Sequence, residues 1–353
     1  MKCIQFKKEP IYIDDFIKLP KKLYDSKTNT EDEKEIKELL NETHTLSKYF
    51  KLYKFVIYDE NELVGRFTIT KYPDDNNAYL GFYECVNDDK TARFLFTAAE
   101  KFCKKNNFKK IIGPVNASFW LKYRLKINNF NYLPYTGEPY NKDYYLKQFQ
   151  DNKYKVIEHY TSNIYKTVEY SYINDKYQSR YEDYIKKGIK IISPNMDNFN
   201  SILSELYHLL TSLYNDFPIY KDISKEDFLT IFNSYKKIIN PSMIKLAYHK
   251  KKLVGFFISI PNYNNKVYNL TLPNIIKVLC TKHKPKEYVM LYMGADPEYK
   301  GIGSSLAYSI INELKESKLP SIGALARDGK VTQHYANDLI DNVYEYVLLE
   351  REL

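Results

Sequence analysis

Two distant segments of the chain share one pattern of apolar and polar positions. In each, a β-rich run leads through a short polar connection into a second β-rich run, which predicts a β-hairpin. The first hairpin covers residues 53–57 and 63–69, and the second covers residues 244–248 and 253–258. Both return strands begin with the pattern Leu-Val-Gly-x-Phe. This repetition indicates that the chain contains two copies of one fold.

The elements that follow each hairpin come in the same order. A strand over residues 79–86, an amphipathic helix and a strand over 110–113 follow the first hairpin. An insertion, a strand over 288–295, an amphipathic helix and a strand over 321–326 follow the second. Apolar side chains recur at helical spacing in both helices. They are Leu95, Ala98, Ala99 and Phe102 in the first helix, and Leu306, Ala307, Ile310, Ile311 and Leu314 in the second.

This order of elements predicts an α/β fold of the α+β kind. Each half would form a mixed, mostly antiparallel central sheet flanked by helices. We place the two domains at residues 1–170 and 171–353, with the boundary in the polar stretch 168–187. Ser224, with Asp227 three residues later, predicts the N-cap of a helix in the second domain.

Composition agrees with two globular domains. The chain has 353 residues, of which 44% are hydrophobic and 27% charged, so it can bury a core and does not have the composition of a disordered chain. The net charge of +9 comes from lysines that are scattered among acidic residues. No concentrated basic track points to nucleic acid, whereas a mildly basic protein suits a small polyanionic cofactor.

The cysteines and the N-terminus limit the compartment and the chemistry. Cys3, Cys85, Cys103 and Cys280 form no C-x-x-C pair, and the sequence shows no zinc-ligand spacing. We therefore expect reduced thiols and no metal. The N-terminus lacks the apolar core of a signal peptide, and no uncharged stretch is long enough to span a membrane. We expect a cytoplasmic protein without a membrane partner.

The segment 290–306 carries the most specific signal in the sequence. An apolar strand leads into the turn Gly301-Ile302-Gly303, which opens an amphipathic helix. Glycines let the backbone approach a pyrophosphate, and the N–H groups and dipole of the helix N-terminus attract it. Leu306 stands where a dinucleotide-binding fold needs a third glycine, and a Walker A loop is absent. A purely structural turn is the alternative for a lone G-x-G.

In these residues the sequence resembles the GNAT superfamily of N-acyltransferases. The family pattern of strand, Pro-containing loop, G-x-G and helix matches residues 295–306. Later elements match as well, with a helix that carries Tyr335 and a final strand over 344–350 that closes the domain. The resemblance covers residues 189–353.

The loop departs from the family pattern at several positions. Glu298 stands where the family has a basic residue or Gln, and the spacing from Pro297 to Gly301 is shorter than in many members. Asp328 stands where Asn is common, and Lys300 could supply the missing positive charge. A non-catalytic binding or regulatory protein that kept the fold is therefore one alternative.

The resemblance implies an acyl-CoA co-substrate, most simply acetyl-CoA, and direct attack of an amine on the thioester. The donor would contact the strand end and the helix N-terminus, through Met293, Gly294, Ala295, Lys300, Gly301, Ile302, Gly303, Ser304 and Ser305. Tyr335 would be the catalytic general acid for the departing thiolate, with a tyrosine packed at a helix–sheet seam as the alternative. Glu287, Tyr292 and Asp296 are candidates for the general base.

The N-terminal half lacks the glycine loop. Asp88 and Asp89 stand at the equivalent place and would repel a pyrophosphate, so we expect no coenzyme A there. Residues 113–145 are nevertheless similar to a group of bacterial tandem-GNAT proteins, which share a Gly-Pro-x-Asn strand end and a later Pro-Tyr-Asn-x-x-Tyr-Tyr segment. Its aromatic and polar side chains could bind substrate: Asn116, Trp120, Tyr123, Arg124, Glu138 and Tyr140. An ordered loop that shapes the domain interface is the alternative.

These patterns together predict an acyl-CoA-dependent N-acyltransferase, foremost an N-acetyltransferase. Its acceptor would be the amine of a small molecule or a peptide. Aminoacyl transfer from tRNA, which some proteins with the doubled fold perform, is a second alternative to this function. The sequence leaves the acceptor, the acyl chain length and the oligomeric state open.

Overall fold

The computed structural model describes all 353 residues and contains two compact units. Unit 1 comprises Met1–His159 and Glu345–Leu353, and unit 2 comprises Tyr160–Tyr344. The C-terminal end of the chain therefore belongs to the first unit.

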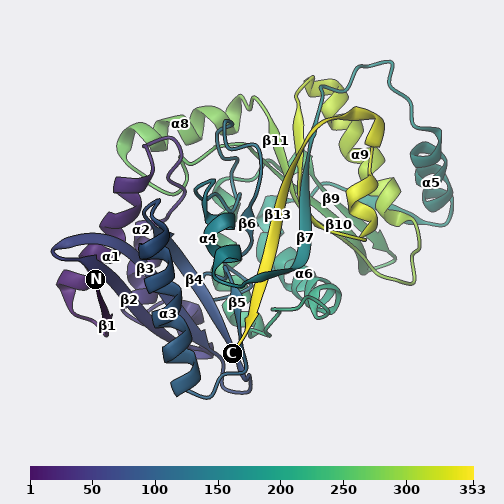
Figure 1. Ribbon diagram of the computed structural model, residues 1–353. Coiled ribbons are helices and arrows are strands. Elements are labelled where there is room, and N and C mark those ends of the chain that lie inside the picture. The colour runs from purple at the N-terminus through teal and green to yellow at the C-terminus, as the bar shows by residue number, and fades with distance from the viewer. The chain divides into compact units, whose positions relative to one another are not determined.

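Unit 1 is a mixed, mostly antiparallel sheet with helices on both faces (Figure 1). The strand order is β1-β2-β3-β4-β5-β13, and only β4 and β5 pair in parallel. The strands are β1 (Lys2–Phe6), β2 (Lys51–Asp59), β3 (Glu62–Lys71), β4 (Asn77–Cys85), β5 (Lys110–Gly113), β6 (Leu125–Lys126) and the end of β13 (Ile340–Glu352). The helices are α1 (Pro10–Leu23), α2 (Glu33–Leu40), α3 (Asp89–Lys105) and α4 (Tyr145–Asp151), with a 3-10 turn, η1 (Thr45–Tyr49).

Unit 2 repeats this plan. The strand order is β7-β12-β11-β10-β9-β8, and only β11 and β12 pair in parallel. The strands are β7 (Lys155–Tyr165), β8 (Ile189–Ile192), β9 (Ile244–His249), β10 (Lys252–Pro261), β11 (Tyr288–Ala295) and β12 (Ser321–Arg327). The α-helices are α5 (Asp175–Lys186), α6 (Phe199–Tyr214), α7 (Lys225–Phe232), α8 (Leu272–His283) and α9 (Ile302–Ser317). The 3-10 turns are η2 (Met196–Asn198), η3 (Asn233–Lys237), η4 (Pro241–Met243), η5 (Val331–His334) and η6 (Asn337–Leu339).

The shared Leu-Val-Gly pattern has the same packing role in both units. A β-carbon on Gly65 of β3 would lie 3.1 Å from Leu95 of α3, and one on Gly255 of β10 would lie 3.1 Å from Leu306 of α9. Each glycine lets the long helix approach its sheet closely. Both predicted hairpins are confirmed, as β2–β3 and β9–β10, and so is the α/β fold with two similar halves.

Helices cover both faces of each sheet because neighbouring strand residues point to opposite faces. In unit 1, Gly65 faces α3, while the next side chain, Arg66, stacks on Phe16 of α1 at 4.4 Å. In unit 2, α9 lies on one face and α6 on the other, and α5 packs against α9. The predicted N-cap is confirmed, since the hydroxyl of Ser224 accepts a hydrogen bond from the N–H of Asp227 at 3.2 Å.

Two expectations about the end of the chain are wrong. Tyr335 does not lie on an α-helix, but between the 3-10 turns η5 and η6. Gly329 and Ala336 have φ angles of 77° and 50°, and this left-handed backbone prevents a continuous helix. The final strand does not belong to unit 2 alone, because Leu349 pairs with Gly113 of β5 in unit 1. In unit 2, Tyr165 of β7 instead pairs with Ser321 of β12.

Candidate donor site and candidate ligand pocket

The loop between β11 and α9 has the backbone geometry of an anion cradle. Gly301 is the N-cap of α9 and has φ 96°, a conformation that favours glycine. Within the loop, Ile302 donates its N–H to the carbonyl of Tyr299 at 3.1 Å, and Ser304 donates to Gly301 at 3.0 Å. The amides of Gly301 and Gly303 are therefore the ones that the turn can offer to an anion.

The strand before this loop has one open edge. Met290 and Gly323 form the last pair between β11 and β12, although both strands continue beyond it. On its other edge β11 stays paired with β10 as far as Ala295, with a bulge after Met290. The backbone from Met293 to Ala295 thus lies outside the parallel ladder, where an extended ligand could bond to it as a strand would.

Side chains alternate along this open edge. Met293 faces α9, because its methyl carbon lies 3.0 Å from where a β-carbon on Gly303 would stand. Gly294 faces the opposite side, where a β-carbon would lie 2.6 Å from Leu213 of α6 and from Phe256. Packing against α6 therefore explains the glycine at position 294, and only its backbone can contribute to a donor site.

Tyr335 lies directly against the glycine turn. Its hydroxyl occupies the space that a β-carbon on Gly303 would need. Burial raises the pKa of Tyr335 to about 12, so the phenol carries its proton at neutral pH. The hydroxyl of Tyr165 donates to the carbonyl of Tyr335 at 2.9 Å, and the N–H of Ala336 donates to Tyr177 at 3.0 Å. These two bonds fix the turn that carries Tyr335.

The remaining predicted donor residues differ in exposure. Lys300 is exposed, and its carbonyl accepts a hydrogen bond from Tyr184 at 2.9 Å. Ile302 is fully buried in the core of unit 2 and can contribute only its backbone. Ser305 is also fully buried, and its hydroxyl has no hydrogen-bond partner. Ser304, next to Tyr335, is the serine that can reach a ligand at the turn.

Arg180 belongs to this site although sequence reasoning missed it. It is an exposed residue of α5, and its Nε lies 3.5 Å from where a β-carbon on Gly301 would stand. The guanidinium therefore stands beside the N-terminus of α9 and adds positive charge to it. No local pattern in the sequence indicates this contact, because α5 lies in the polar stretch between the two predicted domains.

The three candidates for a general base make different contacts in the structure. Asp296 forms an ion pair with Lys252 at 2.8 Å, and the hydrogen bond from Lys252 lowers the pKa of that carboxyl. Burial raises the pKa of Glu287, but this residue precedes β11 and lies about 20 Å along the strand from Met293 at ~3.3 Å per residue. Tyr292 packs edge-on against Phe232 of α7. None of these contacts places a base at the glycine turn.

The equivalent edge in unit 1 is filled by the chain itself. The ladder between β4 and β5 ends at Tyr79 and Ile112. Val115 then donates its N–H to the carbonyl of Leu80 at 2.8 Å. The side-chain oxygen of Asn116 accepts the N–H of Phe82 at 2.7 Å. The Gly-Pro-x-Asn segment thus takes the backbone groups that stay open in unit 2.

The helix N-terminus of unit 1 is also occupied. Asp88 is the N-cap of α3, and its carboxylate accepts the N–H of Thr91 at 2.7 Å. Hydrogen bonds from Thr91 lower the pKa of Asp88, so the group is negative at neutral pH. An internal carboxylate therefore stands where unit 2 has Gly301.

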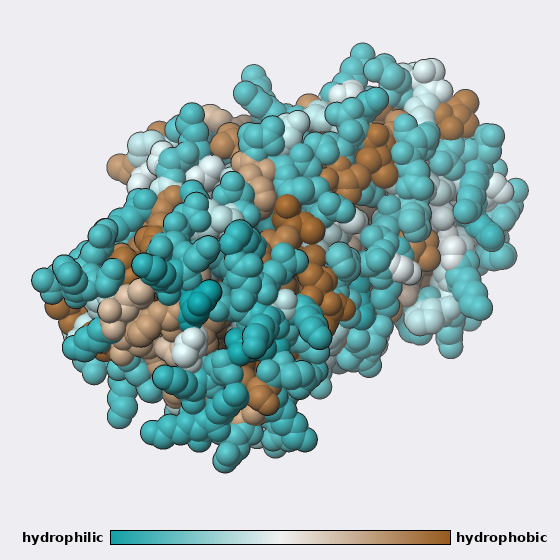
Figure 2. All heavy atoms as spheres, in the orientation of Figure 1, coloured by the Kyte–Doolittle hydropathy of each residue, from teal (hydrophilic) through white to brown (hydrophobic).

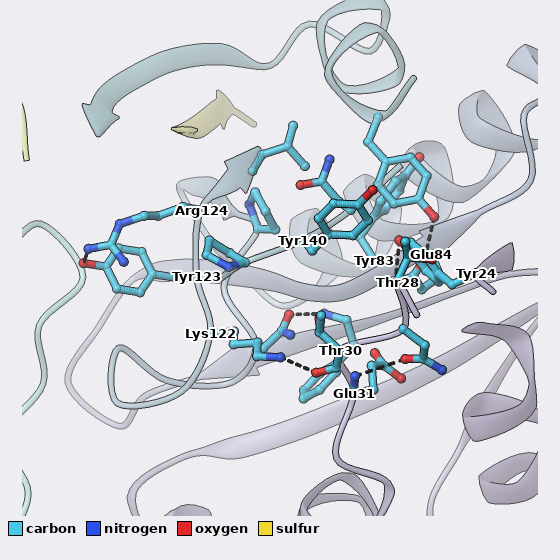
Figure 3. A pocket seen from close by; sticks show the side chains of 18 residues that line it. Tyr24, Thr28, Thr30, Glu31, Tyr83, Glu84, Lys122, Tyr123, Arg124 and Tyr140 are labelled. Carbon is cyan, nitrogen blue, oxygen red and sulfur yellow. Dashed lines mark hydrogen bonds between the residues drawn. The ribbon is translucent and has the colours of Figure 1, made fainter. Parts of the chain in front are cut away.

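Unit 1 contains a polar pocket of about 60 Å³ (Figure 3). Four of the six predicted substrate-binding residues line it, namely Asn116, Tyr123, Arg124 and Tyr140. Trp120 is not among the lining residues, and its ring packs on Phe119. Glu138 is fully buried in an ion pair with Lys126 at 2.6 Å, and its carboxylate also accepts a hydrogen bond from Tyr346 at 2.7 Å. Glu138 therefore supports the pocket wall without lining it.

Sequence reasoning missed the carboxylate at one end of this pocket. Glu84 accepts hydrogen bonds from Tyr24 at 3.0 Å and from Tyr145 at 2.5 Å. Arg66 is shared between Glu84 and Glu31, so two carboxylates face one guanidinium. Burial, with the second carboxylate adding to it, raises the pKa of Glu84 to about 7. Glu84 is the only acidic residue in the largely buried strand β4, and this is the sequence signal that could have indicated a functional carboxylate.

Cationic and strained residues complete the pocket wall. In Figure 3, Arg124 and Tyr123 lie at one end, and Glu84 with Tyr24 lies at the other. Burial lowers the pKa of Lys122 to about 8. Phe82 and Arg124 have φ angles of 47° and 90°. Residues other than glycine in this backbone region are concentrated at ligand-binding and active sites.

Comparisons with known proteins identify the fold. No family model matches the chain. A tandem GNAT protein from the clavulanic acid biosynthesis pathway superposes with a TM-score of 0.57 at 7% identity, covering 99% of this chain and 98% of that one. A GCN5-related N-acetyltransferase from Anabaena variabilis superposes with a TM-score of 0.52 at 9% identity, covering 99% and 73%. The chain therefore has the tandem GNAT fold.

A curated relative is similar in sequence. Protein YghO of Escherichia coli (strain K12) is 22% identical over 218 residues, which are 59% of this chain. The match spans about half of that protein, 55% of its length. The GNAT fold admits an acyltransferase that uses acyl-CoA, while identities this low leave the acceptor open.

Proposed function

We propose that the chain is an acyl-CoA-dependent N-acyltransferase, with acetyl-CoA as the simplest donor and unit 2 as the donor-binding half. The observation that carries this proposal is the combination of an open β11 edge with a glycine turn at the N-terminus of α9. An extended pantetheine can bond to a strand edge, and a pyrophosphate needs amide donors and positive charge. The open strand edge and the glycine turn lie within one short segment of unit 2.

Each residue of the donor site then has a defined role. The backbone of Met293 and Ala295 bonds the pantetheine, and amide groups of this edge polarise the thioester carbonyl. The amides of Gly301 and Gly303 hold the pyrophosphate, with Ser304 as a hydroxyl donor. Arg180 and Lys300 supply the positive charge that Glu298 does not give.

The reaction follows from these positions. The amine nitrogen forms a bond to the thioester carbonyl carbon, and the C–S bond breaks with its electron pair on sulfur. Tyr335 donates its proton to the departing thiolate, which is chemically reasonable because its phenol stays protonated at neutral pH. The amine loses its proton to solvent or to a base from the acceptor side.

We also propose that the pocket of unit 1 binds a small molecule that carries both an amine and an anionic group. Glu84 shares its guanidinium with Glu31, so a ligand ammonium would balance the second carboxylate. A simple amine would be repelled by Lys122 and Arg124, whereas a carboxylate or phosphate on the same ligand would be attracted. Tyrosine rings along the wall suit a compact organic ligand.

Turnover with a panel of amines tests the proposed function. Release of free thiol from acetyl-CoA is measured with amino acids, polyamines, amino sugars and peptides that have a free N-terminus. The proposal expects thiol release that depends on one class of amine and stops in Gly303→Asp. Coenzyme A binding without turnover for any amine would favour the non-catalytic alternative that Glu298 and Asp328 suggest. Thiol release that requires an aminoacyl-tRNA would favour aminoacyl transfer.

A further inference from the structure

Helix α8 exposes a stripe of large apolar side chains. The exposed fractions of Leu272, Ile275, Ile276 and Leu279 are 79%, 39%, 61% and 53%. These positions follow the i, i+3, i+4, i+7 spacing of one helix face. Of the residues of α8, only Val278 is buried. The helix therefore presents to water the kind of face that a globular protein normally turns to its core.

The segment that contains α8 is basic and free of acidic residues. Residues 262–286 include no Asp and no Glu, in a chain that has 44 of them. The same segment carries five lysines, Lys266, Lys277, Lys282, Lys284 and Lys286. On α8 itself, Lys277 lies outside the apolar stripe, whereas Lys282 continues its spacing, three residues after Leu279 and seven after Ile275. The helix is thus amphipathic, with an apolar face that ends at a lysine near its C-terminus.

We propose that α8 binds the surface of a lipid bilayer that contains anionic lipids. An amphipathic helix of this kind lies in the interface, with its apolar face among the acyl chains and its lysines at the headgroups. Lys277, Lys284 and Lys286 can extend to phosphate groups while the stripe inserts, whereas the ammonium of Lys282 donates to the carbonyl of Lys237 at 2.8 Å. None of the helices is long and apolar enough to cross a bilayer, so the contact is with the surface.

The combination of features favours a bilayer over other partners. A nucleic acid would use the lysines but would leave the apolar stripe in water. A second protein copy would cover the stripe but gives no reason for the absence of acidic residues over the whole segment. A bilayer with anionic headgroups uses both properties at once. The proposal departs from the expectation of no membrane partner.

Cys280 provides a probe within the helix. It is exposed at the edge of the stripe, whereas Cys85 and Cys103 are buried. In full-length protein with Cys3→Ser, an environment-sensitive fluorophore is attached to Cys280. Vesicles of phosphatidylcholine alone are compared with vesicles that also contain phosphatidylglycerol. The proposal expects a blue shift and increased emission only with phosphatidylglycerol, and a loss of this signal at high salt.

Variants separate insertion from charge. Ile276→Ser with Leu279→Ser should weaken vesicle binding by roughly tenfold or more, since two of the four apolar side chains of the stripe are lost. Lys284→Ala with Lys286→Ala should also weaken vesicle binding, and the loss should be larger for vesicles that contain more anionic lipid. Ile11→Ser is the matched control, because Ile11 is 65% exposed on α1 of unit 1, and this change should leave vesicle binding unaltered.

Several results would overturn the proposal. A fluorophore at Cys280 that is already shielded without vesicles would show that protein covers the stripe. If the protein is a dimer in solution and Ile276→Ser makes it monomeric, a second copy of the chain is the partner of the stripe. Equal binding to neutral and anionic vesicles would contradict the role of the lysines. No response to either kind of vesicle would exclude a bilayer as the partner. The measurement needs no acyl-CoA, so its outcome is independent of the proposed transferase function.

Discussion

Val115 donates its backbone N–H to the carbonyl of Leu80 at 2.8 Å, immediately beyond the last pair of the β4–β5 ladder. In unit 2, the β11–β12 ladder ends at Met290 and Gly323, and no backbone segment pairs with this edge of β11 beyond that point. One copy of the fold has therefore filled its strand edge with its own backbone, and the other has kept that edge open. This difference underlies the proposal that only unit 2 binds an acyl-CoA donor.

Gly81 should be essential for the filled edge of unit 1. A β-carbon there would overlap the carbonyl oxygen of Val115. Gly81→Ala should lower the free energy of unfolding by about 1–3 kcal/mol, the usual cost of overpacking a rigid site. Denaturant unfolding measures the loss. Coenzyme A affinity serves as the internal control and should not change, because the proposed donor site lies in unit 2. An unchanged stability would refute the close contact.

Tyr335→Phe should lower kcat by about 10²–10⁴-fold with donor affinity nearly unchanged, if the phenol protonates the thiolate. The phenyl ring keeps the packing against Gly303 and removes only the hydroxyl. Tyr308→Phe on α9 is the matched control and should retain full activity. The three quantities to measure are kcat, donor Kd and Tm. A fall in Tm alone, with kcat per folded molecule within about threefold of the parent, would assign Tyr335 to packing.

Arg180→Gln should weaken coenzyme A binding by roughly three- to tenfold, the effect of losing one exposed cation near a phosphate. The loss should shrink as salt is added, because screening already weakens that attraction in the parent protein. Lys186→Gln on the same helix is the charge-matched control. Equal effects of the two variants would mean that only net charge matters, and that the position of Arg180 beside Gly301 has no role.

Glu84 should make stability fall with rising pH. Its pKa is about 7 in the folded chain, against 4.5 for an ordinary glutamate, so the folded state binds a proton that the unfolded state has released. The resulting stability is fully present below about pH 4.5 and is lost as pH rises through about 7, on the order of 3 kcal/mol in total. Glu84→Gln should remove this dependence.

Chemical unfolding of the parent and of Glu84→Gln across this pH range measures the difference. Glu35, whose pKa burial also raises to about 7, titrates in both proteins, so only the difference between the two curves reports on Glu84. Parallel curves would contradict the buried, shared environment of this carboxyl.

Local patterns were enough to predict the hairpins and the glycine turn at the start of α9. Alternation identified β2–β3 and β9–β10, because one face of each strand must be apolar to pack against a helix. The glycine turn was recognisable because close backbone approach needs glycine at fixed spacing, and Gly301 does adopt a left-handed conformation. These features depend on neighbours in the sequence.

The features that were missed depend on contacts between distant segments. Arg180 reaches Gly301 across more than a hundred residues, through the packing of α5 on α9. The β5 partner of the final strand is equally remote in sequence, so no local pattern could show that Leu349 pairs with Gly113. The helix expected around Tyr335 came from the resemblance alone, and the left-handed Ala336 replaced it with two short turns.

Calorimetric titration of the full-length chain with acetyl-CoA tests the central claim most directly. The account predicts one molecule bound per chain, in unit 2, and no binding to Gly301→Asp, whose carboxylate would face the pyrophosphate. Gly188→Asp is the matched control, since Gly188 has φ 82° and a β-carbon there meets no atom within 4 Å; this variant carries the same strain and charge and should bind normally. Two molecules per chain, or unchanged affinity in folded Gly301→Asp, would contradict the account.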